Sequence, residues 1–401
     1  MRRALAEALV PFYPLAGRLG RDGEGRLEID CNGEGALFVE ADAADTAVDD
    51  FGDFTPTAEL RRLVPDVGEY DTDDDDVSAF PLLLVQVTRF RCGGVCLGIG
   101  TDHYVSDGMS TVHFINAWAE LCRGEQISSP PPFIDRTLLR ARVDQPTFRR
   151  HDEYLPPPPA LPATTAKLLL SAASDETAVE MFKLTRSDLA RLRSRYCLPA
   201  GGRRLSMFAV VAAHVWRCVS LARGLPPEQP TMLLTAVDGR TRLNHPPLPD
   251  GFYGNVVFHA APIAEAGTVM TRGASSLVQA ALDRVDGEYC RSALDYLDRL
   301  PPEELAAIAR RREAAFWYNL VVTSWVRMPI HGADFGWGRP VFMGPAGIAK
   351  EGVAVVFPCA SGDGGLFVVI CLQAEHMGKF RELMNDATAA ECCSTARCSK
   401  M

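Results

Sequence analysis

PLLLVQVTRFRCGGVCLGIGTDHYVSDGMS, residues 81–110, contains two apolar runs of strand length on either side of a glycine pair. Gly93 and Gly94 favour the tight turn of a β-hairpin, so both runs are predicted to be buried strands. The second run leads to His103, and Asp107 and Gly108 follow in a short polar segment. Loops at the ends of strands are the usual place for catalytic side chains. The stretch therefore predicts a hairpin that presents His103 at a functional site.

The spacing of His103 and Asp107 suits acid–base chemistry. A neutral imidazole, whose unperturbed pKa is about 6.5, can accept a proton from an attacking hydroxyl at cellular pH. Asp107 is expected to hold the loop through an ion pair. A histidine and an aspartate four residues apart also occur by chance, so on this motif alone a structural histidine stays the alternative interpretation.

On both sides of the hairpin, the spacing of apolar residues predicts helices and strands. Residues 2–9 have the pattern of a helix ended by Pro11, and alternation around 26–29 and 36–39 predicts two strands. Downstream of the hairpin, apolar residues recur at helical spacing over residues 110–121. The expected core face of that helix comprises Val112, Ile115, Trp118, Ala119 and Leu121. The first part of the chain is thus predicted to be mixed α/β.

A proline-rich connector separates this part from a second one. Prolines crowd the segment between about residues 145 and 165, notably PPPPALP at 156–162, and favour an extended linker. We place a domain boundary here, with an N-terminal domain at 1–160, a C-terminal domain at 161–385 and a disordered, cysteine-rich tail at 386–401. In the second domain we expect helices from Ser187 and over 207–221, and strands at 179–184, 320–326, 353–357 and 366–372.

Composition excludes several classes of function. The 401 residues are 47% hydrophobic, enough for two cores, and a net charge of -10 argues against nucleic acid as a partner. The acidic run at 71–76 has the composition of a solvated loop rather than of a metal cage. The 12 cysteines lack the spacing of a disulfide framework or a zinc site, which predicts reduced thiols, a cytoplasmic location and no metal. No apolar stretch in the sequence is long enough to span a bilayer.

A second motif gives the hairpin histidine its context. DFGWG at residues 334–338 follows TSWVRMPIHGA and precedes RPVFMGP. It is not the DFG of a protein kinase, which would also require a glycine-rich loop and an HRD segment, and the sequence has neither. The pairing of HxxxDG in the middle of the chain with DFGWG near its C-terminal end resembles the BAHD acyltransferase family of plants.

Further segments carry this resemblance over nearly the whole chain. They are most similar to the hydroxycinnamoyl-CoA:shikimate/quinate hydroxycinnamoyltransferase branch. The resemblance implies two chloramphenicol-acetyltransferase-like domains, each a mixed β-sheet with flanking helices, with a substrate channel between them. It also implies a monomer that uses acyl-CoA as co-substrate and a small acceptor, with no tightly bound cofactor. The segments are FYPLAGRL at 12–19, EIDCNGEGALFVEAD at 28–42, FGDFTP at 51–56, PFIDRTLLRAR at 132–142, AVDGRTRL at 236–243 and CRSALDYL at 290–297.

The family mechanism gives roles to residues of both motifs. His103 would deprotonate the acceptor hydroxyl, which attacks the thioester carbonyl, and collapse of the oxyanion would expel coenzyme A. A positioned base contributes roughly 10²–10⁴-fold to such a rate. Thr323 and Trp325 are the implied oxyanion and substrate-binding donors, and a buried aromatic with a satisfied N–H is the alternative for Trp325. The sequence has no GxSxG elbow for a serine nucleophile, which agrees with direct transfer.

Further roles follow from position in the family pattern. Arg310 falls where shikimate-using relatives have an arginine that binds the acceptor carboxylate, and a solvated helix face is the equally supported alternative. Arg240 is the expected ion-pair partner of Asp107, and Arg240 and Ser206 are the candidate coenzyme A contacts. The DFGWG residues are expected to hold a loop without touching substrate: Asp334, Gly336, Trp337 and Gly338.

The sequence also departs from the family. Tyr104 stands where this branch usually has a second histidine, and Gly332 stands where relatives carry an aspartate. Family members carry several tens of residues before the helix that opens this chain, and a missing first strand would expose a sheet edge or leave a core unfilled. Three interpretations stay open. They are a hydroxycinnamoyl transferase, an inactive remnant that binds coenzyme A, and a BAHD enzyme that acylates an amine or another alcohol.

Overall fold

A computed structural model describes most of the chain. It covers residues 1–23, 25–66, 77–142, 149–162, 164, 176–196, 205–271, 273–313 and 318–388. The acidic run at 71–76 and residues 389–401 of the predicted tail lie outside the described residues, whereas residues 386–388, predicted to be disordered, end a helix, Ala374–Thr388.

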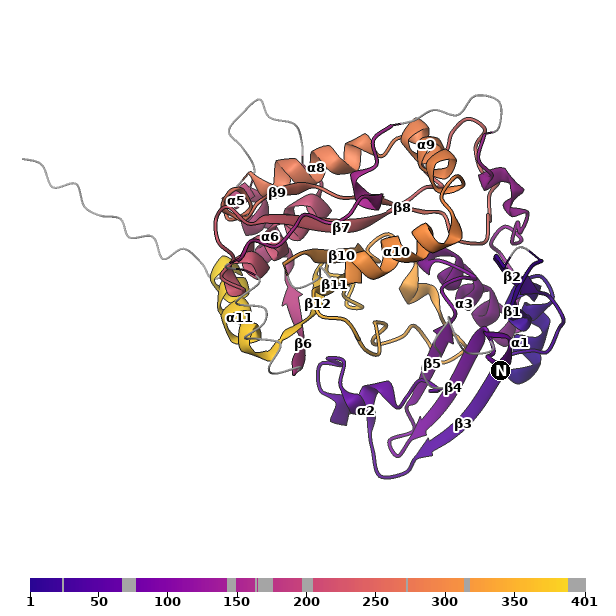
Figure 1. Cartoon of the computed structure of the whole chain (residues 1–401). Coiled ribbons are helices and arrows are strands. Elements are labelled where there is room, and N and C mark those ends of the chain that lie inside the picture. The colour runs from indigo at the N-terminus through magenta and orange to yellow at the C-terminus, as the bar shows by residue number, and fades with distance from the viewer. Residues whose placement is uncertain are drawn as a thin grey trace, which may run out of the picture.

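A three-stranded sheet forms the centre of the N-terminal half (Figure 1). Its strands are β3 (Leu37–Ala43), β4 (Leu83–Phe90) and β5 (Val95–Thr101), in the order β3-β4-β5. β4 and β5 pair antiparallel, which confirms the predicted hairpin, whereas β3 and β4 pair parallel. β1 (Arg18–Arg21) and β2 (Leu27–Asp30) form a separate antiparallel two-stranded sheet.

The helices of this half pack against the sheet. They are α1 (Arg2–Leu9), α2 (Ala58–Arg61) and α3 (Gly108–Cys122), with short 3-10 turns at Tyr13–Ala16, Val48–Phe51 and Val77–Ala79. Four of the five residues predicted for the core face of α3 are buried, and Trp118 is completely so. Leu121 is the exception, because it lies in the last turn of the helix and packs only at the margin of the core.

The C-terminal half is built on a seven-stranded mixed sheet. β10 pairs parallel with both β7 and β11, and the remaining pairs are antiparallel. The predicted strand at 320–326 ends earlier, at Ser324, because the chain turns from Trp325 to Met328. The strands are β6 (Thr177–Leu184), β7 (Pro230–Asp238), β8 (Val257–Ala260), β9 (Ile263–Glu265), β10 (Leu320–Ser324), β11 (Val353–Pro358) and β12 (Leu366–Gln373).

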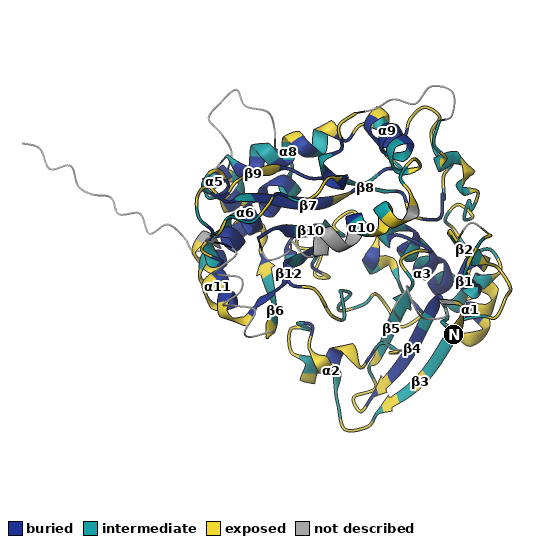
Figure 2. Cartoon of the chain, viewed as in Figure 1, coloured by how far each residue is buried: buried dark blue, intermediate teal, exposed yellow. Residues whose placement is uncertain are grey.

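One long helix, α6 (Met207–Ala222), is buried on most of its surface between the sheet and the outer helices (Figure 2). Its apolar residues belong to the largest core cluster, which also takes in strands β10, β11 and β12. The other helices are α5 (Arg186–Tyr196), α7 (Ala266–Val269), α8 (Ala274–Arg284), α9 (Gly287–Leu297), α10 (Pro302–Glu313) and α11 (Ala374–Thr388).

The connector between the halves is tied to α9. Arg142 binds Asp295 through two nitrogens, at 2.8 and 3.0 Å, and the Asp295 side chain is only 1% exposed. Further along, the His151 ring lies 3.0 Å from Ser292. Short 3-10 turns at Arg136–Leu139 and Asp152–Tyr154 interrupt the connector. The placement of a domain boundary near residue 160 stays a prediction.

A long excursion between β10 and β11, residues 325–352, leaves the large sheet and runs onto the N-terminal half (Figure 1). Asn116 of α3 donates to the carbonyl of Pro329 at 3.2 Å. Phe342 stacks on Phe54 with ring centroids 4.8 Å apart. A 3-10 turn at Ile330–Gly332 lies within this segment. The C-terminal half therefore covers part of the N-terminal half, which brings distant segments of the chain together.

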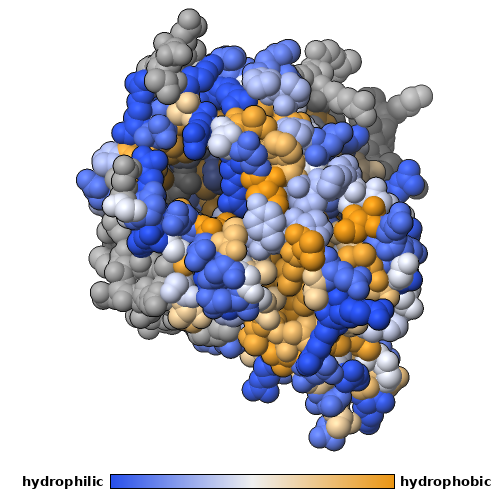
Figure 3. All heavy atoms as spheres, turned by 90° about the vertical axis from the view of Figure 1, so that its right-hand side faces the viewer, coloured by the Kyte–Doolittle hydropathy of each residue, from blue (hydrophilic) through white to orange (hydrophobic). Residues whose placement is uncertain are grey.

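Apolar side chains also reach the surface. Figure 3 shows them gathered on the face where α1 and β3 lie, and at the end of α1 Val10 is 74% exposed. Among the residues that the structure describes, no helix is long and apolar enough to cross a bilayer. The same residues contain no group of three or more His, Cys, Asp or Glu side chains placed to hold a metal ion.

Candidate active site

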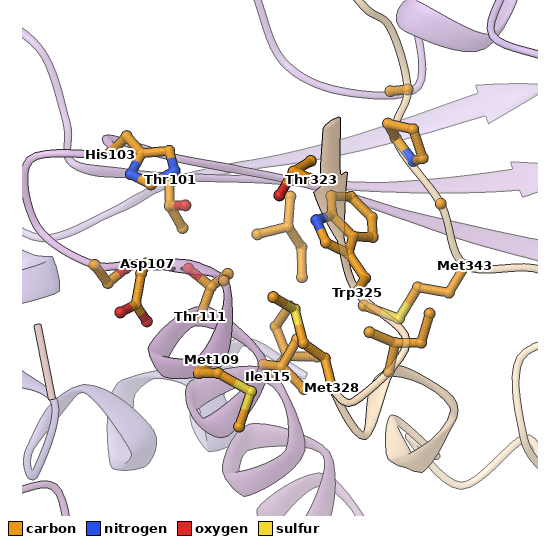
Figure 4. A pocket seen from close by; sticks show the side chains of 18 of the residues that line it. Thr101, His103, Asp107, Met109, Thr111, Ile115, Thr323, Trp325, Met328 and Met343 are labelled. Atoms are coloured by element: carbon orange, nitrogen blue, oxygen red, sulfur yellow. Dashed lines mark hydrogen bonds between the residues drawn. The ribbon is translucent and has the colours of Figure 1, made fainter. Parts of the chain in front are cut away.

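A cavity of about 840 Å³ lies where the two halves meet. Its walls come from five regions of the chain: α2 with the segment that follows it, β5 with the turn that follows it, the start of α3, the paired strands β7 and β8, and the end of β10 with the excursion. His103, Thr323 and Trp325 all line this one cavity. The structure thus brings together the three residues predicted for the chemistry from both halves of the chain (Figure 4).

His103 stands in the turn that leaves β5, as its place at the end of the hairpin predicts. The turn is closed by Asp102, whose carboxylate accepts the Tyr104 amide at 2.8 Å and whose carbonyl accepts the Val105 amide at 3.1 Å. His103 is exposed, and its ring has no hydrogen-bond partner among the described residues. A ring that is not engaged elsewhere can receive a proton from a group in the cavity.

Asp107 points away from the centre of the cavity into a dense set of donors. Arg240 reaches its two carboxylate oxygens at 2.8 and 3.2 Å, which confirms the predicted ion pair. The amides of Ser110 and Val256 donate to the same carboxylate at 3.0 and 2.9 Å. Asp107 is also the N-cap of α3. The carboxylate therefore fixes the loop and the start of the helix and does not contact the His103 ring.

Thr323 and Trp325 form the facing wall. Val322 is fully buried on the opposite face of β10, so strand alternation turns Thr323 toward the cavity, and Trp325 follows two residues later. The Trp325 amide donates to the Val356 carbonyl at 2.8 Å, which anchors the residue at the end of the sheet. In Figure 4 the indole nitrogen of Trp325 faces the open space that separates it from His103. The imidazole of His103 and two potential hydrogen-bond donors thus share one cavity.

Much of the remaining lining is apolar or contains sulfur. Such a surface accommodates a flat aromatic group without leaving buried polar groups unpaired. Figure 4 shows Met109, Ile115 and Met328 grouped below the gap between His103 and Trp325. Leu60, Leu63, Val64, Leu97, Ile99 and Phe342 line the rest of this apolar surface.

Several polar residues in the lining were not predicted from the sequence, among them Asp238, Asn255 and His259. Asp238 lies at the end of β7, and His259 lies on β8, which pairs with it. The VDGR segment contains Asp238 and could have directed attention to it. No signal pointed to Asn255 or His259, because their place in the lining depends on how distant segments meet.

Of the residues predicted to contact coenzyme A, Arg240 lines the cavity and Ser206 does not. Ser206 is the N-cap of α6, where its hydroxyl accepts the Ala209 amide at 3.1 Å. Arg310 lies on α10, but its side chain is outside the described part of the structure. Their roles toward coenzyme A and the acceptor stay predictions, as does that of Arg240.

DFGWG forms a closed loop against α3. The Asp334 carboxylate accepts the amides of Gly336 and Gly338 at 2.8 and 2.9 Å, and these hydrogen bonds, the Gly336 one above all, hold the Asp334 pKa below its ordinary value. Both glycines have positive φ angles, 102° and 93°, a conformation that favours glycine. Phe335 packs edge-on against Trp118 at 4.8 Å, whereas Trp337 is 60% exposed. No DFGWG residue lines the cavity described above.

Comparison with known sequences gives matches over nearly the whole chain. The model of the Transferase family matches residues 1–387. Hydroxycinnamoyltransferase 1 of Oryza sativa subsp. japonica is 60% identical over 387 residues, which are 96% of this chain and 86% of that protein. A hydroxycinnamoyl-CoA:5-hydroxyanthranilate N-hydroxycinnamoyltransferase of Avena sativa is 60% identical over 388 residues, 96% and 85% of the two chains. Shikimate O-hydroxycinnamoyltransferase of Nicotiana tabacum is 49% identical over 390 residues, 96% and 87% of the two chains.

Solved structures share the fold. Vinorine synthase matches with a TM-score of 0.67 at 23% sequence identity, over 96% of this chain and 83% of that one. F. sporotrichioides TRI101, crystallised with coenzyme A and T-2, matches with a TM-score of 0.70 at 18% identity, over 94% and 87% of the two chains. The predicted architecture of mixed sheets with flanking helices is confirmed.

Proposed function

This chain belongs to the Transferase family of BAHD acyltransferases, and we propose that it moves a hydroxycinnamoyl-type acyl group from a coenzyme A thioester to a hydroxyl of a shikimate- or quinate-like acceptor. The observation that carries this proposal is the meeting of His103, Thr323 and Trp325 in one cavity. The mostly apolar lining suits a phenylpropanoid side chain.

In the proposed reaction His103 accepts the proton of the acceptor hydroxyl as its oxygen attacks the thioester carbonyl. The carbonyl π electrons move to oxygen, which gives a tetrahedral oxyanion. Collapse of this intermediate breaks the carbon–sulfur bond and re-forms the carbonyl. The imidazolium returns its proton to the departing thiolate, so the products are the ester and free coenzyme A, and His103 is neutral again.

The oxyanion needs donors aimed at the charge that develops during attack. The indole N–H of Trp325 and the hydroxyl of Thr323 come from the wall opposite the base, which suits an intermediate formed between them. Asp107 serves this step indirectly, because its ion pair with Arg240 fixes the loop on which the base stands.

A matched pair of variants tests the proposal. The purified chain is incubated with p-coumaroyl-CoA and shikimate or quinate, and the ester is quantified by liquid chromatography. Thiol reagents are avoided because Cys31 and Cys92 are exposed free cysteines. His103→Gln is expected to lower the rate of transfer about 10²-fold or more. His113→Gln should stay within about threefold of the wild type, because His113 binds Ser129 and does not line the cavity.

Two outcomes would overturn the proposal. Equal activity of His103→Gln and the wild type would remove His103 as the base. A wild-type chain that binds coenzyme A, measured by calorimetry, but acylates none of the acceptors would favour the inactive remnant.

An amine acceptor is the second candidate, favoured by the name of the Avena sativa relative, an N-hydroxycinnamoyltransferase. A neutral aromatic amine attacks without prior loss of a proton, whereas a hydroxyl needs the base during attack. His103→Gln should therefore reduce amide formation from 5-hydroxyanthranilate less than it reduces ester formation from shikimate. A wild-type chain that forms only the amide would replace the hydroxyl proposal with this one.

A further inference from the structure

The turn that carries His103 is held by side chains from other parts of the chain. Its three successive carbonyls, those of His103, Tyr104 and Val105, all accept hydrogen bonds from outside the N-terminal sheet and its helices. The Asn255 amide donates to the first at 2.7 Å and to the second at 3.3 Å. Arg136, in the 3-10 turn Arg136–Leu139, donates to the third at 2.8 Å. Of the two donors, only Asn255 belongs to the C-terminal half, so the carbonyls of His103 and Tyr104 are held from across the cavity.

Asn255 belongs to the segment 254–256, which forms hydrogen bonds with both ends of the HxxxD loop and with the start of α3. On one side of it, the Gly254 amide and carbonyl both bond to the Ser110 hydroxyl, at 3.0 and 3.1 Å. On the other side, the Val256 amide donates to Asp107 at 2.9 Å. Gly254 has a φ of 144°, and a Cβ there would lie 3.1 Å from Arg136, so a larger residue would disturb these hydrogen bonds.

The imidazole itself receives no comparable support. In hydrolase triads an acidic side chain binds the histidine ring and orients it. Here the nearby acid, Asp107, is bound to Arg240 and to backbone amides, and no described residue bonds to the His103 ring. The hydrogen bond that His103 does accept is the one from Asn255 to its carbonyl. The backbone of the turn therefore has to fix the direction of the ring.

We propose that Asn255 is a positioning residue for the general base, an inference that rests on the proposed function. Its side-chain amide bridges the carbonyls of His103 and Tyr104 from the cavity wall formed by the C-terminal half. By holding the turn, it holds the imidazole in line with the acceptor hydroxyl. Its contribution therefore belongs to the chemical step rather than to the binding of the thioester.

The test removes the amide donor and then restores it. Asn255→Ala and Asn255→Asp are expected to lower kcat about tenfold or more with p-coumaroyl-CoA and shikimate, and to change the KM for the thioester less than about threefold. Asn255→Gln keeps the N–H donor one methylene further out and should recover part of the lost kcat. The melting temperature is measured for each variant, so that loss of folded protein is separated from loss of rate.

Asn116→Asp is the matched control. Asn116 also donates its side-chain amide to a carbonyl across the two halves, that of Pro329 at 3.2 Å, but it does not line the cavity. Its kcat should stay within about threefold of the wild type. A kcat loss in Asn116→Asp equal to that in Asn255→Asp, or a wild-type kcat in Asn255→Ala, would overturn the inference and leave the proposed function standing. A wild-type chain without transferase activity would overturn both.

Discussion

At the scale of single residues, Asp107 is a motif residue whose contacts are all structural. Its side chain is buried and each carboxylate oxygen has at least two donors, from Arg240, Ser110 and Val256. Loss of such a carboxylate lowers the stability of the fold, because removal of one member of a buried ion pair leaves an uncompensated charge.

Asp107→Asn should therefore destabilise the fold as well as the activity. The variant keeps the volume of the side chain but removes the buried counter-charge of Arg240, whose side chain is 18% exposed and which then has only Asp238, itself 34% exposed, at 3.1 Å. We expect the free energy of unfolding, measured with urea, to fall by about 3 kcal/mol. Glu40→Gln removes a carboxylate from the surface pair with Arg89 and should cost less than about 1 kcal/mol. Equal losses in the two variants would contradict this account.

His103, the proposed base, and the ion pair that holds its loop could be predicted from the sequence. Asn255, the proposed positioning residue, could not. His103, Asp107 and Arg240 stand in motifs, whereas Asn255 lies in a loop that matched no motif. Its importance depends on a contact between residues 103 and 255, which no local pattern encodes. Local periodicity and spacing report on the secondary structure in which a residue lies. They do not report on its neighbours across an interface.

At the scale of elements, β5 and the segment after α2 approach unusually closely. A Cβ on Gly98 would lie 1.8 Å from the carbonyl oxygen of Leu63, so the two backbones could not keep this contact with any other residue at position 98. Gly98, Leu63 and Val64 all line the cavity. The shape of this wall therefore depends on the absence of a side chain.

Gly98→Ala is expected to push the segment after α2 away from β5. Overpacking of this kind typically costs about 1–3 kcal/mol, and the displaced wall should raise the KM for the thioester or the acceptor. Gly20→Ala, also in a strand, is the control, because the nearest atom to its added Cβ is 4.0 Å away. Steady-state kinetics and urea unfolding measure both effects. A Gly98→Ala chain that matches Gly20→Ala in stability and KM would contradict the proposed close contact.

The helices and strands were largely predictable, since apolar runs and helical spacing are local properties. The excursion after β10 was not, because its loops have no periodic pattern and its docking depends on Phe54, Asn116 and Trp118 in the other half. The same reason explains why the predicted strand at 320–326 extended past Ser324. Of the two apolar residues that follow Ser324 in that prediction, Trp325 lines the cavity and Val326 is 40% exposed, so neither extends the sheet.

At the scale of the whole molecule, two large cores lie on either side of the cavity. The core of the C-terminal half contains a buried histidine, His214, whose ring contacts the Tyr196 hydroxyl at 3.1 Å and the Cys218 sulfur at 3.5 Å. Burial, together with the charges of Arg195 and Arg217, lowers the His214 pKa to about 3.

The His214 pKa predicts a pH dependence of global stability. In the unfolded chain the pKa of this histidine is about 6.5, so below that pH the unfolded state binds a proton that the folded state does not bind. The free energy of unfolding should be highest above this pH and fall by up to about 1.4 kcal/mol per pH unit between it and the folded pKa. His214→Gln should flatten the slope measured in urea between pH 7.5 and 5, whereas His245→Gln, at an exposed position, should not. An unchanged slope in His214→Gln would contradict the role of this group.

The excursion has a consequence for synthesis on the ribosome. The hairpin with its base is made early, but the facing wall, with Thr323 and Trp325, emerges only after most of the chain has been translated. A nascent chain released before β10 would lack this wall and should leave p-coumaroyl-CoA intact, which a chain ended at residue 319 can test. On this account acyl transfer begins only when synthesis is complete, and unfinished chains consume no activated thioester.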